Sequence, residues 1–237
     1  MMTRLLAVFA AAFTVTACGG SEPPAKAPTH ETTDDDGDGS SSPIAVSAEV
    51  GALDEEKVTR VFQDSVSGLQ ACLNAGAKRV EFIGGSVAFS LEVDQSGHLA
   101  SGYVAESTLG DRATEKCMLG VLEGKSWPAP VGGQKGLAKK SFDFDPPNDV
   151  RAPEQWSEDR VREALDDKAS DISACKSSAQ GSYQVTLYVG TSGQALSVGV
   201  APPSARGESA ADCLVELLKG VTYPSPGSWP AKVSLSL

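Results

Sequence analysis

The sequence predicts an α+β protein that contains two copies of one small domain. The stretch CMLGVLEGKSWPAP at residues 117–130 returns as CLVELLKGVTYPSP at residues 213–226, with the cysteine, one glycine, the aromatic residue and both prolines in the same places. Helix-like and strand-like periodicities also follow one another in the same order in both halves. The 237 residues allow two small domains with thin cores, because aromatic residues make up only 6% of the chain.

The chain begins with a segment typical of a secretory signal peptide. Residues 1–17 combine a basic residue, an apolar stretch and small residues, and the segment is too short to span a membrane. Residues 15–18, Val-Thr-Ala-Cys, resemble the bacterial lipoprotein signal; the alternative is an ordinary cleaved signal with an incidental cysteine. The resemblance implies that Cys18 carries acyl chains. Because Gly19 follows it, the resemblance also implies an anchor in the outer membrane, with the domains facing the periplasm.

Residues 18–53 are predicted to form a tether, because up to residue 43 they are rich in Pro, Ser, Gly and Asp and lack large apolar side chains. Three carboxylates, Asp34, Asp36 and Asp38, have the spacing of a calcium-binding loop. The last position of such a loop requires a bidentate glutamate, and here it is Ala45. We therefore expect a solvated acidic spacer without a metal site, and a calcium-responsive tether is the alternative.

Each copy is expected to open with an amphipathic helix. At an offset of 103 residues, Asp54 and Ser157 are the predicted N-caps, and acidic residues occupy both first turns. Apolar residues then recur at helical spacing up to Cys72 and Cys175. Beyond the cysteines the offset is 96, because the first copy has seven extra residues around positions 74–84.

Two strands, a short helix and a last strand follow in each copy. The hairpin turns place Gly97 and Gly193 where a positive φ is needed, and the short helices end at Gly124 and Gly220, which we expect to form left-handed C-terminal caps. The predicted strands lie at residues 87–93, 99–105 and 140–144 in the first copy and at residues 183–189, 195–200 and 232–237 in the second.

Four cysteines remain after Cys18, and in an oxidising compartment an even set predicts disulfides. Four cysteines allow three pairings, but the repeat selects Cys72 with Cys117 and Cys175 with Cys213. On the loop-entropy model, a bridge that closes a loop of roughly 40 residues contributes about 4 kcal/mol to the stability of a small domain. We therefore expect structural cystines without a redox role.

This order of elements, with a turn from Asp94 to Gly97 and an aromatic-Pro stretch before the last strand, resembles the TonB C-terminal domain. The cysteine pair in each copy brings the resemblance closer to the AgmX/PglI C-terminal domains of myxobacterial envelope and motility proteins. The resemblance covers residues 54–145 and 154–237, with residues 146–153 as a linker. It implies, for each copy, a three-stranded antiparallel sheet with two helices on one face.

The same resemblance implies that an extended segment of a protein partner pairs with the last strand of a copy, as an additional strand at the sheet edge. The residues expected at this partner-binding edge are Phe142, Phe144, Val233 and Leu235.

The composition excludes several other functions. A net charge of -11 without a run of basic residues argues against nucleic acid or anionic lipid as the main ligand. His30 and His98 are isolated, and no sequence motif of a catalytic or phosphate-binding site is present. We therefore expect no catalytic residues, no cofactor and no small-molecule substrate.

The large aromatic side chains are the last candidates for a binding surface. Trp127 and Tyr223 are expected in the cores, and for Trp156 and Trp229 a core position and a place in a peptide groove stay open. The sequence therefore favours a non-enzymatic envelope lipoprotein that binds a protein partner, with motility or transport as the candidate processes. The alternative is a structural spacer in which the two copies pack on each other without a ligand.

Overall fold

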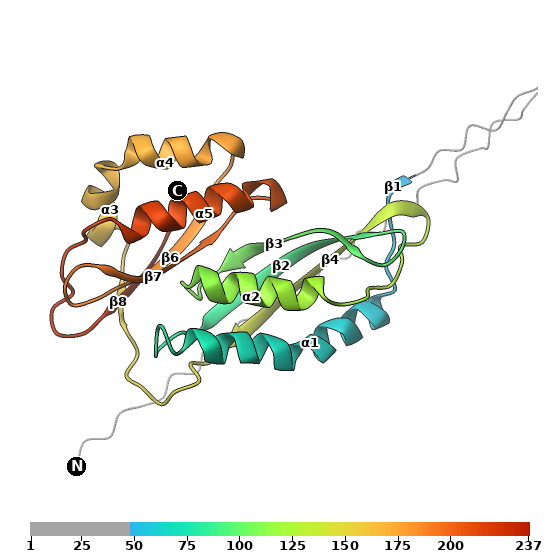
Figure 1. Cartoon of the computed structure of the whole chain (residues 1–237), viewed down its shortest axis with the longest axis horizontal. Coiled ribbons are helices and arrows are strands. Elements are labelled where there is room, and N and C mark those ends of the chain that lie inside the picture. Colours follow the sequence, from blue (N-terminus) through green and yellow to red (C-terminus); the bar gives the residue numbers. More distant parts are fainter. Residues whose placement is uncertain (1–47) are drawn as a thin grey trace, which may run out of the picture. The chain divides into compact units, whose positions relative to one another are not determined.

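A computed structural model describes residues 48–237, and these residues belong to one compact unit (Figure 1). We call residues 48–144 copy 1 and residues 154–237 copy 2. The predicted signal peptide, Cys18 and the carboxylates Asp34, Asp36 and Asp38 lie outside the described residues. Among residues 48–237, no helix is both long and apolar enough to cross a membrane.

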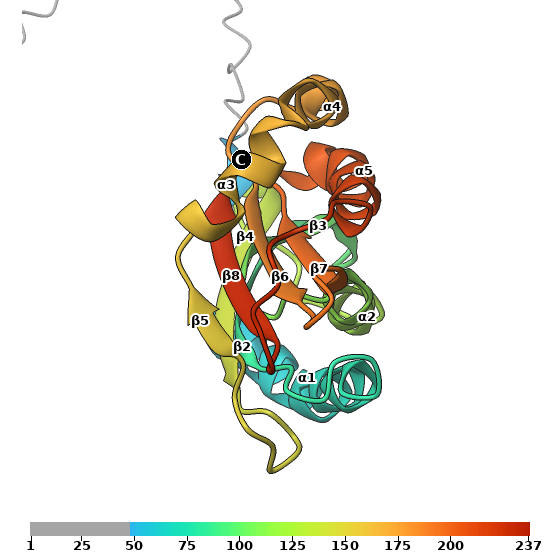
Figure 2. The ribbon, with the colours of Figure 1, turned by 90° about the vertical axis from the view of Figure 1, so that its left-hand side faces the viewer.

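Both copies are α+β units with one mixed sheet each. Copy 1 consists of β1 (Ala48–Gly51), α1 (Glu55–Gly76), β2 (Gly85–Asp94), β3 (Leu99–Ser107), α2 (Arg112–Glu123) and β4 (Gly133–Phe144). Copy 2 consists of β5 (Glu154–Trp156), α3 (Asp159–Asp166), α4 (Ala169–Cys175), β6 (Gln184–Val189), β7 (Ala195–Ala201), α5 (Glu208–Lys219) and β8 (Ala231–Ser236), with short 3-10 turns at Lys176–Ser178 and Ala205–Gly207. In the view of Figure 2, α1, α2 and α5 lie on one side of the sheets.

Each sheet has four strands, so the prediction of three-stranded antiparallel sheets was wrong. The strand orders are β1-β4-β2-β3 and β5-β8-β6-β7. The missed strands, β1 and β5, pair in parallel with the first residues of β4 and β8, and β1 lies in a segment that was expected to belong to the tether. Strands of three or four residues are too short to show the alternation that identifies a strand in a sequence.

The first helix of copy 2 also differs from the prediction. Copy 1 has the expected single helix, and its N-cap Asp54 accepts a hydrogen bond from the N–H of Lys57 at 3.0 Å. Copy 2 has two short helices instead, and the first begins at Asp159 without a side-chain cap from Ser157. We attribute the break to Lys168, which stands where copy 1 buries Ser65, because an unpaired ammonium group is costly to bury.

The glycine predictions divide into two groups. Gly97 and Gly193 both have φ +80°, as the hairpin turns require. Gly124 and Gly220 do end their helices, but with φ of -75° and -81°, so the prediction of left-handed caps was wrong. Both helices close instead with right-handed turns, a conformation that does not require glycine.

The disulfides join Cys72 to Cys117 and Cys175 to Cys213, so each ties the first helical segment of a copy to the second. Trp127 and Tyr223 are buried at equivalent places in the two cores. The Nε1–H of Trp127 donates to the carbonyl of Leu122 at 3.2 Å, and the hydroxyl of Tyr223 donates to the carbonyl of Leu218 at 2.9 Å. The two aromatic residues therefore anchor the chain between the second helix and the last strand in each copy.

The two copies pack on each other through equivalent parts. The edge strands β3 and β7 contact each other without forming a ladder, and α2 approaches α5 through ion pairs. Arg112 pairs with Glu208, and Lys116 pairs with Asp212 at 2.9 Å. At the repeat offset of 96, each of these pairs joins one position of copy 1 to the same position of copy 2. The contact therefore resembles a two-fold contact between identical molecules in which the charges have become opposite.

The seven extra residues of copy 1 add an asymmetric contact to this interface. Phe82, from the loop that follows α1, lies 5.2 Å from Tyr188 of copy 2, measured between ring centroids. In the same loop, the carbonyl of Gly84 accepts a hydrogen bond from Lys232 Nζ at 2.8 Å. An insertion that only one copy carries therefore contacts the sheet of the other copy.

Candidate functional site

Most of the predicted partner-binding residues do not form an accessible surface. Phe142 and Phe144 pack into the core of copy 1, and their rings stack at 6.2 Å. Val233 is buried, and its strand pairs with β5 on one side and β6 on the other at that position. Leu235 lies at a groove, and Phe144 also borders a cavity beside the contact between the copies. The side chains of the other three residues face inward, toward the helices of their own copy, and their role in binding a partner stays a prediction.

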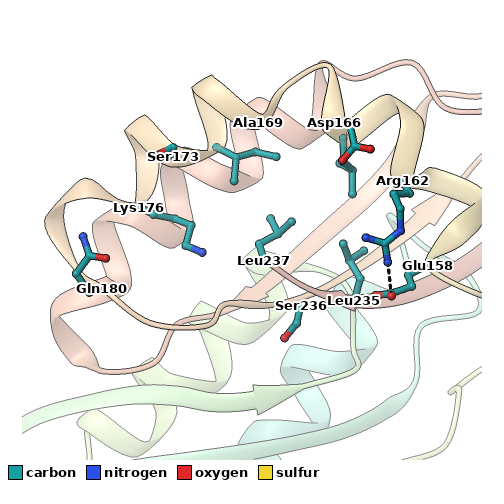
Figure 3. A pocket seen from close by; sticks show the side chains of 12 residues that line it. Glu158, Arg162, Asp166, Ala169, Ser173, Lys176, Gln180, Leu235, Ser236 and Leu237 are labelled. Carbon is teal, nitrogen blue, oxygen red and sulfur yellow. Dashed lines mark hydrogen bonds and ion pairs between the residues drawn. The ribbon is translucent and has the colours of Figure 1, made fainter.

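The cavity at Leu235 is a groove of about 420 Å³ between the helices α3 and α4 and the end of β8 (Figure 3). Its apolar lining comes from both sides, and it includes Leu165, Ile172, Leu235 and Leu237. We call it the β8 groove. All of its lining residues belong to copy 2, and the two short helices α3 and α4 form one wall.

The backbone of β8 has unpaired groups beside this groove. Tyr183 and Leu237 exchange both backbone hydrogen bonds at 3.0 Å, so the odd-numbered residues of β8 point their N–H and C=O groups toward β6. Ser234 and Ser236 therefore point theirs outward. The parallel pairing of Trp156 with Val233 engages the outward N–H of Ser234. The outward groups that no strand among residues 48–237 pairs are therefore the C=O of Ser234 and the N–H and C=O of Ser236. A free sheet edge thus opens directly into the groove.

Charged groups surround the groove and differ at its two ends (Figure 3). Arg162 forms ion pairs with Glu158 and, at 3.6 Å, with Asp159. At the other end Lys176 lies with its Nζ 5.6 Å from the ring centroid of Tyr183. Within the described part of the chain, Lys176 has no carboxylate within ion-pair distance.

Copy 1 offers a weaker version of the same edge. The strand β1 covers the outer side of β4 only as far as Gly136, so the backbone beyond it is unpaired on that side. The exposed side chains along it include Leu137, which is 51% exposed, and Lys139. The rings of Phe62 and Phe142 pack beneath this edge, with their centroids 6.0 Å apart. Lysine on an exposed edge also opposes unspecific pairing with other strands.

A second group of buried polar residues lies between the two copies, where sequence reasoning found no signal. Asp111 accepts hydrogen bonds from Arg79, Thr114 and Ser197, and although burial opposes it, these bonds hold the pKa of Asp111 below its usual value. Burial raises the pKa of Glu115, one oxygen of which accepts the N–H of Val200 at 3.2 Å. The bonds from Ser197 and Val200 come from copy 2, so this group links the two copies through hydrogen bonds.

The interface also borders a shallow cavity of about 570 Å³ on the other side of the sheets. Lys232 lines it, and burial lowers the pKa of Lys232 to about 8. Its Nζ lies 5.3 Å from the ring centroid of Tyr188 and donates a hydrogen bond to the carbonyl of Gly84 in copy 1. Lys232 therefore contributes to the packing of the two copies.

Three further residues that the sequence offered as site candidates make contacts within a turn or with packed side chains and backbone. His98 lies in the hairpin turn, where its Nδ1 is 2.8 Å from the hydroxyl of Ser96. Trp156 packs against the core of copy 2, and Trp229 donates its Nε1–H to Ala152 at 3.1 Å. Neither tryptophan lines the β8 groove. Among the described residues no cluster of three potential metal ligands is found.

No protein-family model matches this chain, and no match to a curated protein or a solved structure is found either. The resemblance to TonB C-terminal and AgmX/PglI domains therefore stays a prediction from the sequence pattern. The β8 groove and the free edge beside it are the features of the described residues that define a candidate binding site.

Proposed function

We propose that the protein is a non-enzymatic envelope protein that binds an extended segment of a protein partner at the outer edge of β8. The observation that carries the proposal is the unpaired outward backbone at the end of β8, the C=O of Ser234 and the N–H and C=O of Ser236, at a sheet edge that opens into the β8 groove. Unpaired strand groups supply the affinity in strand addition, and a neighbouring pocket supplies the specificity.

The proposed location rests on the sequence. The signal-like residues 1–17 and the lipoprotein-like Cys18 support a lipid anchor in the outer membrane, with the two copies in the periplasm. Two disulfides are consistent with such an oxidising compartment. The resemblance to TonB C-terminal and AgmX/PglI domains supports a place in an envelope assembly for motility or transport.

The test compares two substitutions at one position. Ser236→Pro removes the outward N–H and leaves the hydrogen bonds to β6 intact, whereas Ser236→Ala keeps the N–H. Both variants lose the contact between the hydroxyls of Ser236 and Ser182, 2.8 Å apart, so this loss cancels in the comparison.

Full-length protein, processed by the producing cell and carrying an affinity tag, would be crosslinked in the cell envelope and its partners identified. We expect the alanine variant to retain the partner and the proline variant to lose it. A partner captured equally by both variants would rule out strand addition at this edge.

A structural spacer is the second candidate, and the buried interface between the copies favours it. Arg112 is only 7% exposed in its side chain and bonds to groups of copy 2, as a rigid two-part spacer would require. This candidate predicts that no partner is crosslinked at β8 and that substitutions in the groove have no effect in the cell.

A further inference from the structure

We infer that the β8 groove takes an extended peptide that inserts a bulky apolar side chain, preferably aromatic, and places a carboxylate beside Lys176. The inference rests on the proposed function and specifies the chemistry of its partner. It is drawn from a comparison of the two copies, because copy 1 shows what fills the same space when no groove is left.

The ladder registers identify the equivalent positions. Phe142 of β4 stands opposite Val87 of β2, and Leu237 exchanges hydrogen bonds with Tyr183, the residue that aligns with Val87 at the repeat offset of 96. Leu237 therefore occupies the place of Phe142. In the first helical segment, at the offset of 103, Leu165 takes the place of Phe62.

Copy 1 fills this space with aromatic rings. The ring of Phe142 lies 6.0 Å from that of Phe62 and 6.2 Å from that of Phe89, measured between centroids. Copy 2 has aliphatic residues at all three places, and the third is Val185. Two of the three replacements, Leu165 and Leu237, line the β8 groove. The groove is therefore the space that aromatic rings occupy in copy 1, and its shape and apolar lining fit such a ring from a partner.

The charge at one end of the groove specifies a second feature of the partner. Leu73 of copy 1 is fully buried, and its equivalent in copy 2 is Lys176, at the edge of the groove. Among the described residues Lys176 contacts the Tyr183 ring but forms no ion pair. An acidic side chain in the bound peptide would complement this ammonium group.

The probes are fluorescein-labelled, blocked heptapeptides of threonine and serine with one variable central residue, Phe, Leu, Ala or Lys. Each is made with either Asp or Asn two positions from the centre, on either side. Binding to the full-length protein, as processed by the cell, is followed by fluorescence anisotropy. We expect the Phe peptide to bind roughly ten- to hundredfold more tightly than the Ala peptide, because a buried side chain of that size contributes by its apolar area.

Two variants connect the preferences to the groove. Lys176→Met keeps the length of the side chain and should abolish the preference for Asp over Asn. Leu165→Phe gives copy 2 the residue that copy 1 has at this position, so it should fill the groove and raise the midpoint of thermal unfolding. It should weaken the binding of the Phe peptide at least about tenfold and change the binding of the Ala peptide little. The rise in thermal stability shows at the same time that this variant is folded.

Each outcome bears on one of the two proposals. Equal affinity for all central residues, lost in Ser236→Pro, would overturn this inference and leave strand addition intact. An aromatic preference that Leu165→Phe does not change would overturn it as well. If none of the peptides binds, the inference is also overturned, and the crosslinking comparison of the two Ser236 variants then decides the proposed function by itself.

Discussion

Glu115 sits at the contact between the two copies with no exposed surface. One of its oxygens accepts the N–H of Val200, and the other accepts no hydrogen bond from the described residues. Burial raises the pKa of Glu115, and it outweighs the nearby hydroxyl of Ser107 and the charge of Arg112, both of which favour the ionised carboxylate. A carboxyl group with a raised pKa holds its proton in the folded protein at a pH where the unfolded chain releases it.

The sign of the resulting pH dependence follows from this difference. Above the ordinary value of 4.5, the folded state binds more protons than the unfolded chain, so the Glu115 contribution to the free energy of unfolding falls as pH rises. Glu115→Gln does not titrate and keeps an acceptor for Val200. We expect the stability of this variant to rise relative to that of the wild type as the pH is raised above 4.5.

Urea denaturation at several pH values measures the difference. Glu123→Gln, an exposed substitution on the same helix α2, is the control for the removal of one carboxylate from this helix. A stability difference between wild type and Glu115→Gln that stays constant with pH would contradict the assignment.

Gly199 on β7 tests how closely the copies are packed. A Cβ at this position would meet the Glu115 carboxylate and lie 2.9 Å from the Cα of Gly110. Gly199→Ala should therefore lower the free energy of unfolding by about 1–3 kcal/mol. Gly120→Ala is the matched control: its Cβ would meet nothing within 4 Å, and it lies in α2, where alanine should stabilise the helix by about 0.5–1 kcal/mol. Equal effects of both substitutions would mean that the interface can shift to accommodate an added methyl group.

At the scale of elements, the two copies hold their first helical segments in different ways. The long helix α1 buries Phe62, Leu69 and Leu73 among its inward residues. The short helix α4 buries only Ile172, and it is tied to α5 by the disulfide from Cys175. The helix that borders the β8 groove therefore depends more on its cystine than on packing.

This difference predicts local opening when the cystine of copy 2 is removed. In the double variant Cys175→Ala and Cys213→Ala, amide hydrogen exchange should become faster by an order of magnitude or more in residues 159–178, because few buried contacts remain there. In the variant Cys72→Ala and Cys117→Ala, α1 should keep its protection relative to the rest of copy 1. Exchange followed by mass spectrometry compares the two, and equal loosening of both helices would contradict the prediction.

Much of this element order could be predicted from the sequence, and the exceptions have physical causes. Long periodic segments such as α1 and β2 carry their own signal, and the glycine at Gly97 marks its turn. The strands β1 and β5 carry none, because three or four residues in a parallel pair depend on the partner strand. The break at Lys168 follows from a single charged residue at a position that copy 1 buries.

The candidate site could be predicted only as far as one residue, Leu235. Sequence reasoning chose the last strands correctly as places with free backbone groups, but it could not tell an inward side chain from an accessible one. The groove results from smaller residues at two separated positions, Leu165 and Leu237, which meet only after the strand register is fixed. A position-by-position comparison of the two copies was the signal that could have found it.

At the scale of the whole molecule, opposite charges at equivalent positions hold the two copies together. Arg112 is nearly buried between Glu208 and Asp212, so a like charge at those positions would leave it without compensation. Reversal of the two acidic charges of copy 2, in Glu208→Lys with Asp212→Lys, should lower the free energy of unfolding by about 3 kcal/mol or more.

Reversal of the charges in both copies should restore part of the lost stability. The quadruple variant adds Arg112→Glu and Lys116→Glu, which recreates opposite charges with the copies exchanged. Thermal unfolding of the wild type and both variants measures the recovery, and Glu216→Lys, an exposed charge change on α5, should cost no more than about 1 kcal/mol. A quadruple variant that is no more stable than the double variant would show that these ion pairs do not act as a unit.

The meeting of β3 with β7 has a consequence for how such a chain could grow. Because each copy offers the same surface to the other, the association is complete once two are joined, and a third module appended to the chain would find that surface occupied. A further duplication would therefore require a different interface between modules, whereas a linear array of repeats can be extended at either end.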